Sequence, residues 1–129
     1  SFNARLPKGI TMFGGGMRQA GIIAAGALYA LEHHRARLAE DHTNARALAK
    51  GLAHLPGLEL DAATVQTNIV LMRVQRLPAA TFASALDQAG VRVLAVGPDT
   101  IRAVTNLMVS SEEITAALEI FESTLRRVH

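Results

Sequence analysis

The stretch VRVLAVGPDTIRAVT, residues 91–105, decides the fold class of this chain. Residues 91–96 and 101–105 are rich in valine, isoleucine and threonine, which favour strands. Gly97-Pro98-Asp99 lies between them and has the composition of a turn. This order predicts that the two strands pair as an antiparallel hairpin.

Two more strands and a helix are predicted upstream of this hairpin. Residues 68–74 hold a dense run of isoleucine, valine, leucine and methionine, and residues 58–60 form a shorter apolar segment. Between them and the hairpin, Pro78 suits the first turn of a helix, and Gly90 lies just past the end of that helix. Two strands, a helix and two further strands therefore follow one another.

Three segments repeat apolar residues with the spacing of an amphipathic helix. Their apolar positions are Leu38, Ala45, Leu48, Leu52 and Leu55 in the first, Phe82, Leu86 and Ala89 in the second, and Ile114, Ala117, Leu118, Phe121 and Leu125 in the third. Pro56-Gly57 ends the first helix, and Ser110 with Glu113 forms a capping box before the third. Ser110 and Ser111 are accordingly interpreted as cap residues and not as nucleophiles.

Residues 17–31 differ because they are apolar on every side, with no charge between Gln19 and Glu32. This pattern predicts a buried helix. Gly21 and Gly26 lower its helix propensity but let a neighbouring backbone approach closely. A second surface is therefore expected to cover this helix.

The predicted element order is ααββαββα, an α+β domain in which helices lie on one face of a small, mostly antiparallel sheet. A chain of 129 residues that is 50% hydrophobic is long enough to bury one core. Residues 1–11 are predicted to be an irregular polar lead, and residues 12–129 to form the domain.

Composition excludes several classes of protein. The absence of cysteine excludes disulfides and thiol catalysis and fits a reducing cytoplasm. No apolar run reaches the roughly 18 residues that span a bilayer. The net charge of +2 comes with only 4% aromatic residues, which argues against nucleic-acid binding, and the histidines lack the spacing of a metal site. The expected protein is cytoplasmic and has no membrane, nucleic-acid or metal partner.

The run Gly14-Gly15-Gly16-Met17-Arg18 has two interpretations. Three glycines free the backbone to approach a ligand, the helix that follows offers unpaired N–H groups, and Arg18 adds a forked cation, so the run has the parts of an anion site. A hinge before an ordinary helix start explains the same residues, and neither a Walker loop nor a dinucleotide fingerprint is present. On the residues alone the hinge is favoured.

Arg102 stands out within its predicted strand. Alternation puts it on the face opposite Ile101, alongside Val104, which is unusual company for a guanidinium. A carboxylate partner is expected there. The alternative is a strand-edge arginine in water or in a salt bridge.

Several motifs together point to a known family. The run MFGGGMRQAG at residues 12–21 is continued by LYALE at 28–32 and LAEDH at 38–42. With TNIV at 67–70 and IRAVTN at 101–106, these motifs strongly resemble the C-terminal third of low-specificity L-threonine aldolases. The resemblance covers most of the chain.

The resemblance implies a pyridoxal-phosphate-dependent enzyme of the aspartate-aminotransferase-like fold type I, in which a small C-terminal domain follows a large cofactor domain. Such enzymes cleave threonine or allo-threonine to glycine and acetaldehyde, and this chain corresponds to their linking helix and small domain. By the same resemblance Arg102 would bind the carboxylate of the amino-acid substrate. Arg18, Gly15 and Gly16 would lie near the cofactor's phosphate. A missing N-terminal half or further copies in a homo-oligomer would complete the site.

Lysine content bears directly on activity. The lysine that binds the cofactor is expected upstream of this chain, because neither Lys8 nor Lys50 occupies the family's position. Pyridoxal phosphate needs an amine and an enclosed pocket, so the chain alone is expected to be inactive and to hold no catalytic residue. The alternative is a non-catalytic module that keeps the small-domain fold and associates with itself or another protein through residues 17–31.

Overall fold

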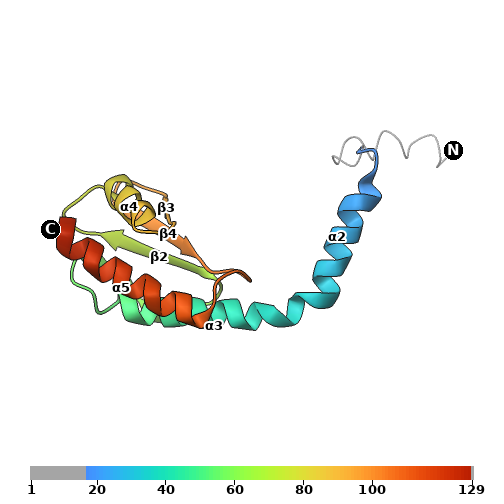
Figure 1. Cartoon of the computed structure of the whole chain (residues 1–129), viewed down its shortest axis with the longest axis horizontal. Coiled ribbons are helices and arrows are strands. Elements are labelled where there is room, and N and C mark those ends of the chain that lie inside the picture. Colours follow the sequence, from blue (N-terminus) through green and yellow to red (C-terminus); the bar gives the residue numbers. More distant parts are fainter. Residues whose placement is uncertain (1–16, 129) are drawn as a thin grey trace. The chain divides into compact units, whose positions relative to one another are not determined.

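The structure is a computed structural model that describes residues 17–128 (Figure 1). The chain divides into two compact units, Ser1–Ala36 and Arg37–His129. The predicted irregular lead at residues 1–11 and the predicted glycine hinge at 14–16 lie outside the described residues. No helix within residues 17–128 is long and apolar enough to cross a membrane.

The described part of the first unit is dominated by one helix, α2 (Ala20–His33), which confirms the helix predicted at 17–31. Gln19 precedes it in the left-handed backbone region, with a φ of 58°, and no side chain caps the first turn. The predicted burial is wrong, since no residue of α2 is buried and Ile22 is 77% exposed. An apolar pattern indicates that a helix needs cover, but it does not specify the covering surface.

The second unit contains a four-stranded sheet and its helices. The helices are α3 (Leu38–Leu52), α4 (Ala79–Gln88) and α5 (Ser111–Val128), and the strands are β1 (Leu58–Glu59), β2 (Ile69–Val74), β3 (Leu94–Ala95) and β4 (Thr100–Val104). Short 3-10 turns lie at Arg35–Arg37 and Ala62–Thr64. The strands are ordered β1-β2-β4-β3, and all three neighbouring pairs are antiparallel. This arrangement confirms the predicted order ααββαββα and the α+β class.

The core lies between the sheet and the helices of the second unit, where α3 and α5 run side by side (Figure 1). Buried and exposed residues alternate along β2 and β4, because successive side chains of a strand point to opposite faces. The inward residues are Val70, Met72, Val74, Ile101 and Ala103. Phe82 and Phe121 are fully buried between the helices, with ring centroids 6.0 Å apart in an edge-to-face arrangement. The helices thus cover one face of the sheet.

Two element boundaries differ from the prediction. β3 covers only Leu94–Ala95 instead of 91–96, because the N–H of Val91 donates to the carbonyl of Leu86 at the end of α4, at 2.9 Å. That hydrogen bond makes the start of the predicted strand part of the helix end. The helix α3 stops at Leu52, ahead of the predicted Pro-Gly stop, and short turns follow it. Apolar patterns are weakest at edge strands and helix ends.

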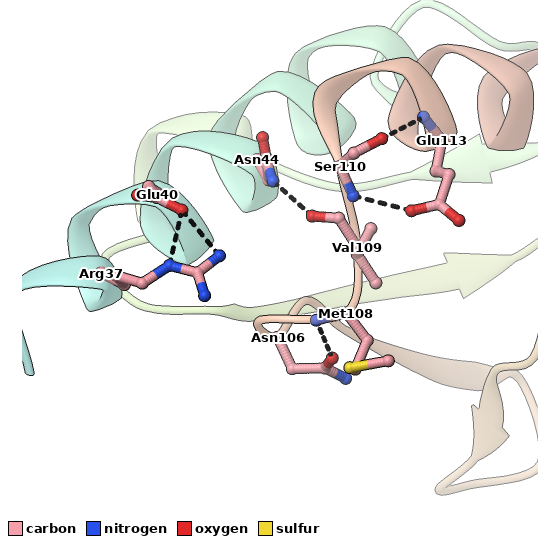
Figure 2. Close-up of polar contacts among 8 residues, drawn as sticks. All are labelled: Arg37, Glu40, Asn44, Asn106, Met108, Val109, Ser110 and Glu113. Atoms are coloured by element: carbon pink, nitrogen blue, oxygen red, sulfur yellow. Dashed lines mark hydrogen bonds and ion pairs between the residues drawn. The ribbon is translucent and has the colours of Figure 1, made fainter. Parts of the chain in front are cut away.

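The start of α5 carries the predicted capping box (Figure 2). The N–H of Ser110 donates to Glu113 Oε2 at 2.8 Å, and the N–H of Glu113 donates to Ser110 Oγ at 3.2 Å. Each of these hydrogen bonds satisfies a backbone donor that has no partner within the helix. The capping role predicted for Ser110 is therefore confirmed.

Candidate functional site

One face of the sheet is apolar around a single central arginine. Its outward residues are Ile69, Leu71 and Arg73 of β2, Thr100, Arg102 and Val104 of β4, and Leu94 of β3. We call this set the open sheet face, because the described helices of the second unit pack on the opposite face. Its four large apolar side chains are between 42% and 54% exposed.

Arg102 lies in the middle of the open sheet face. Its Cα pairs with that of Leu71 on β2 and with that of Leu94 on β3. The side chain is partly buried, and its Nε is buried without a hydrogen-bond partner. A buried donor left unpaired costs about 1–3 kcal/mol, so such an atom needs an explanation. The prediction that Arg102 and Ile101 point to different faces of the sheet is confirmed. No ion pair to Arg102 exists within residues 17–128.

Arg73, on the same face, has carboxylate partners. Its Nε and Nη2 donate to Asp99 Oδ2 at 3.0 and 2.7 Å, and its Nη1 lies 4.0 Å from Glu59 Oε2. The hydrogen bond with Asp99 raises the pKa of Arg73. The same bond, together with one from Thr100 Oγ1, lowers the pKa of Asp99. The carboxylates at this end of the sheet are therefore engaged by Arg73 and not by Arg102.

An Arg73→Gln substitution is expected to raise the pKa of Asp99 toward its ordinary value, because the guanidinium hydrogen bond is the largest cause of the lowering. Folding lowers this pKa, so the ion pair contributes stability above the pKa of the unfolded chain. That contribution is lost as pH falls through the lower pKa of the folded chain. A ¹³C NMR titration of the Asp99 carboxyl in both proteins measures the change. Equal pKa values would mean that the ion pair does not form in solution.

A second polar cluster lies where the loop before α5 meets the start of α3 (Figure 2). Asn44 Nδ2 donates to the carbonyl of Val109 at 2.9 Å, and Arg37 donates through Nε and Nη2 to Glu40, both at 3.3 Å. With Met108 these residues line an open groove. Each polar side chain drawn there already has a partner in the chain. The cluster therefore explains how the loop is held, and the sequence did not predict the Asn44 link.

Arg18 and Arg102 belong to different units: Arg18 is exposed ahead of α2 in the first, and Arg102 lies on β4 in the second. Gly15 and Gly16 lie outside the described residues. Lys50 is exposed on α3. In the part of the chain that the structure describes, no three His, Asp or Glu side chains form a possible metal site.

Comparison with protein families decides which family the chain comes from. The family model described as "Beta-eliminating lyase" matches residues 5–75, more than half of the chain. The chain belongs to this family. The part matched to the beta-eliminating lyases runs through α2 and α3 to the end of β2, and Arg102 lies beyond it.

This beta-eliminating lyase family member is similar to curated threonine aldolases over most of its length. "Probable low-specificity L-threonine aldolase 2" of Arabidopsis thaliana is 37% identical over 112 residues, covering 84% of this chain and 32% of the relative. "Low specificity L-threonine aldolase" of Escherichia coli (strain K12) is 36% identical over 116 residues, covering 90% of this chain and 33% of the relative. The expected resemblance is confirmed, and the chain spans about a third of the length of these relatives.

A solved structure shares the fold. "The structure of MppP soaked with the product 2-ketoarginine" matches with a TM-score of 0.59 and 15% sequence identity, covering 74% of this chain and 30% of that chain. At this identity the likeness concerns the fold alone. It agrees with the α+β arrangement that the element order predicts for this beta-eliminating lyase family member.

Proposed function

We propose that this chain forms the small domain of a pyridoxal-phosphate-dependent threonine aldolase, which cleaves threonine or allo-threonine to glycine and acetaldehyde. The family and the named relatives support this class of enzyme. One structural observation supports the part that this chain plays: the buried, unpaired Nε of Arg102 on the open sheet face. Because Nε is sheltered and no carboxylate within residues 17–128 pairs with this guanidinium, its Nη donors are available to a ligand carboxylate.

In this proposal Arg102 binds the carboxylate of the amino-acid substrate. A guanidinium presents a planar fork of N–H donors that matches the two oxygens of a carboxylate. The half-exposed apolar side chains around it exclude water once a ligand and a covering surface are in place. Charge-assisted hydrogen bonds strengthen in such a low-dielectric setting, so the substrate is held in a fixed orientation.

The described residues do not by themselves fit pyridoxal phosphate. The cofactor supplies an electron sink once it is bound to an amine in an enclosed pocket. Lys50 is exposed on a solvated helix face, and Lys8 lies outside the described residues. We therefore assign the cofactor's lysine to sequence beyond these 129 residues. Arg18 with Gly15 and Gly16 is proposed to lie near the phosphate, as the threonine aldolase resemblance implies.

The purified 129-residue chain is expected to release no acetaldehyde from threonine in the presence of pyridoxal phosphate. Borohydride reduction is expected to fix no cofactor on Lys50, because an exposed lysine lacks an enclosing pocket. A coupled assay with alcohol dehydrogenase measures acetaldehyde, and the Escherichia coli relative serves as the positive control. Acetaldehyde above the protein-free blank would contradict the assignment of the lysine to another part of the enzyme.

The missing parts can be supplied by a relative. In a fusion, this chain replaces the matched 116-residue segment of the Escherichia coli relative, which then contributes the remaining two thirds of its own sequence. We call this protein the fusion. It is expected to release acetaldehyde from threonine, and it allows substitutions in this chain to be assayed by their effect on kcat and KM.

The exposed surface of α2 supports a second proposal, that the chain associates with itself. Ile22, Leu28 and Leu31 are 77%, 56% and 65% exposed, and apolar surfaces of this kind seldom remain in water. Light scattering is expected to give a mass above the 13.7 kDa of one chain, and an Ile22→Glu substitution is expected to lower it. A concentrated solution that remains monomeric would contradict this second proposal.

A further inference from the structure

Leu71, Arg102 and Leu94 form one row across three neighbouring strands. The β2–β4 register pairs Leu71 with Arg102, and the β3–β4 register pairs Leu94 with Arg102. Residues directly opposite each other on antiparallel strands have Cβ atoms about 4.5–5.5 Å apart and point to the same face. The arginine stem therefore lies between two leucine side chains.

The burial of Arg102 Nε requires cover on an otherwise open face. The described helices of the second unit pack on the opposite face, so the cover comes from neighbours of Arg102 on its own face. Leu71 and Leu94 are 54% and 53% exposed, so nearly half of each side chain is covered although no described helix of this unit packs on that face. They are the apolar residues directly across from Arg102 on the two neighbouring strands.

The charges near this row leave Arg102 available to a ligand. Glu59 and Asp99 are engaged by Arg73, which occupies the next row along β2 and pairs with Thr100. Leucine side chains offer no hydrogen-bond acceptor, so the two flanking residues do not compete with a ligand for the guanidinium.

We infer that Leu71 and Leu94 are positioning residues that hold Arg102 so that it meets a carboxylate end-on, through its two Nη atoms. Nε is sheltered, whereas neither Nη atom is both buried and unpaired. An end-on guanidinium still donates to both carboxylate oxygens. The inference rests on the proposed role of Arg102 and adds to it the direction of approach and the residues that set this direction.

The shelter of Nε can be measured in the full 129-residue chain by NMR of the arginine Nε–Hε groups. The Hε of Arg102 is expected to exchange with water at least about tenfold more slowly than that of Arg127, an exposed residue in the last turn of α5. Leu71→Ser and Leu94→Ser are each expected to remove most of this difference, and Leu94→Met to retain it. Ile69→Ser is the matched control, because Ile69 lies on the same strand and face as Leu71 but pairs with Val104.

A kinetic readout in the fusion separates positioning from a structural role. Leu94→Ser is expected to raise KM for threonine about fivefold and to leave kcat within about twofold, because the substrate carboxylate is held in the ground state and the transition state alike. Leu38→Ser changes an apolar residue of α3 that is 49% exposed and lies off the open sheet face, so it is expected to change neither parameter.

The failures of the inference and of the proposed function are distinguishable. Equal Hε exchange rates for Arg102 and Arg127 in the unsubstituted chain would overturn the inference, and so would equal KM values for the Leu94→Ser and Leu38→Ser fusions. An Arg102→Gln fusion with unchanged kinetics would overturn the proposed function instead, whatever the exchange rates are.

Discussion

An Arg102→Gln substitution in the fusion is expected to lower kcat/KM for threonine on the order of 100-fold. Glutamine removes the charge and the forked donors that are proposed to bind the substrate carboxylate. Each hydrogen bond to a charged group contributes about 1.5–3 kcal/mol, and two such bonds account for a loss of this size. Arg102→Lys keeps the charge without the fork, so it is expected to recover only part of the activity.

The matched control for this loss is Arg92→Gln. Arg92 is also an arginine of the second unit, but its side chain is 92% exposed and pairs with Asp87 at the surface. The contribution of such an exposed pair is small, so kcat/KM is expected to stay within about twofold. Equal losses in the two variants would mean that a general change in charge, and not carboxylate binding by Arg102, explains the effect.

A Phe121→Ala substitution is expected to lower the free energy of unfolding of the 129-residue chain by about 3–5 kcal/mol. Phe121 is fully buried and meets Phe82 edge-to-face, so alanine leaves a cavity between α4 and α5 and removes an aromatic pair. The free energy of unfolding of a typical domain is only about 5–15 kcal/mol, so this substitution removes a large share of the stability. Urea unfolding followed by circular dichroism measures the change.

Met108→Ala provides the comparison, because Met108 is 84% exposed in the loop before α5. Substitutions at such positions usually stay within about 0.5 kcal/mol. If Phe121→Ala lowered stability no more than Met108→Ala, the contacts between α4 and α5 would not be the core of the second unit.

The C-terminal helix illustrates which parts of the fold can be predicted from the sequence. Its capping box and its apolar stripe are local patterns, and both appear in α5, where Ile114, Phe121 and Leu125 are buried. The alternation in the two central strands is equally local. In β4 it correctly predicts that Ile101 and Arg102 point to different faces of the sheet.

The errors lie where structure depends on distant contacts. The residues of α2 have the composition of a buried helix, yet whether a helix is buried depends on a surface elsewhere, and none of its residues is buried. The strand predicted at residues 91–96 shortens to Leu94–Ala95, because a hydrogen bond from Val91 to the preceding helix competes with the sheet.

The candidate site shows the same division between local pattern and distant contact. Alternation along β4 predicts that Arg102 points to the sheet face away from Ile101, and the structure agrees. The neighbours of Arg102 do not follow from alternation, because a strand's register is set by pairing with other strands. Leu71 and Leu94 therefore appear beside Arg102 only in the folded sheet.

Acetaldehyde release from threonine by the fusion tests the central claim most directly. The assay compares the fusion with the intact Escherichia coli relative and with the same relative lacking the matched 116-residue segment. We predict cofactor-dependent acetaldehyde release from the fusion and the intact relative, and none from the shortened relative or from the 129-residue chain alone. A fusion that folds and binds pyridoxal phosphate but releases no acetaldehyde would contradict the claim that this chain is the small domain of a threonine aldolase.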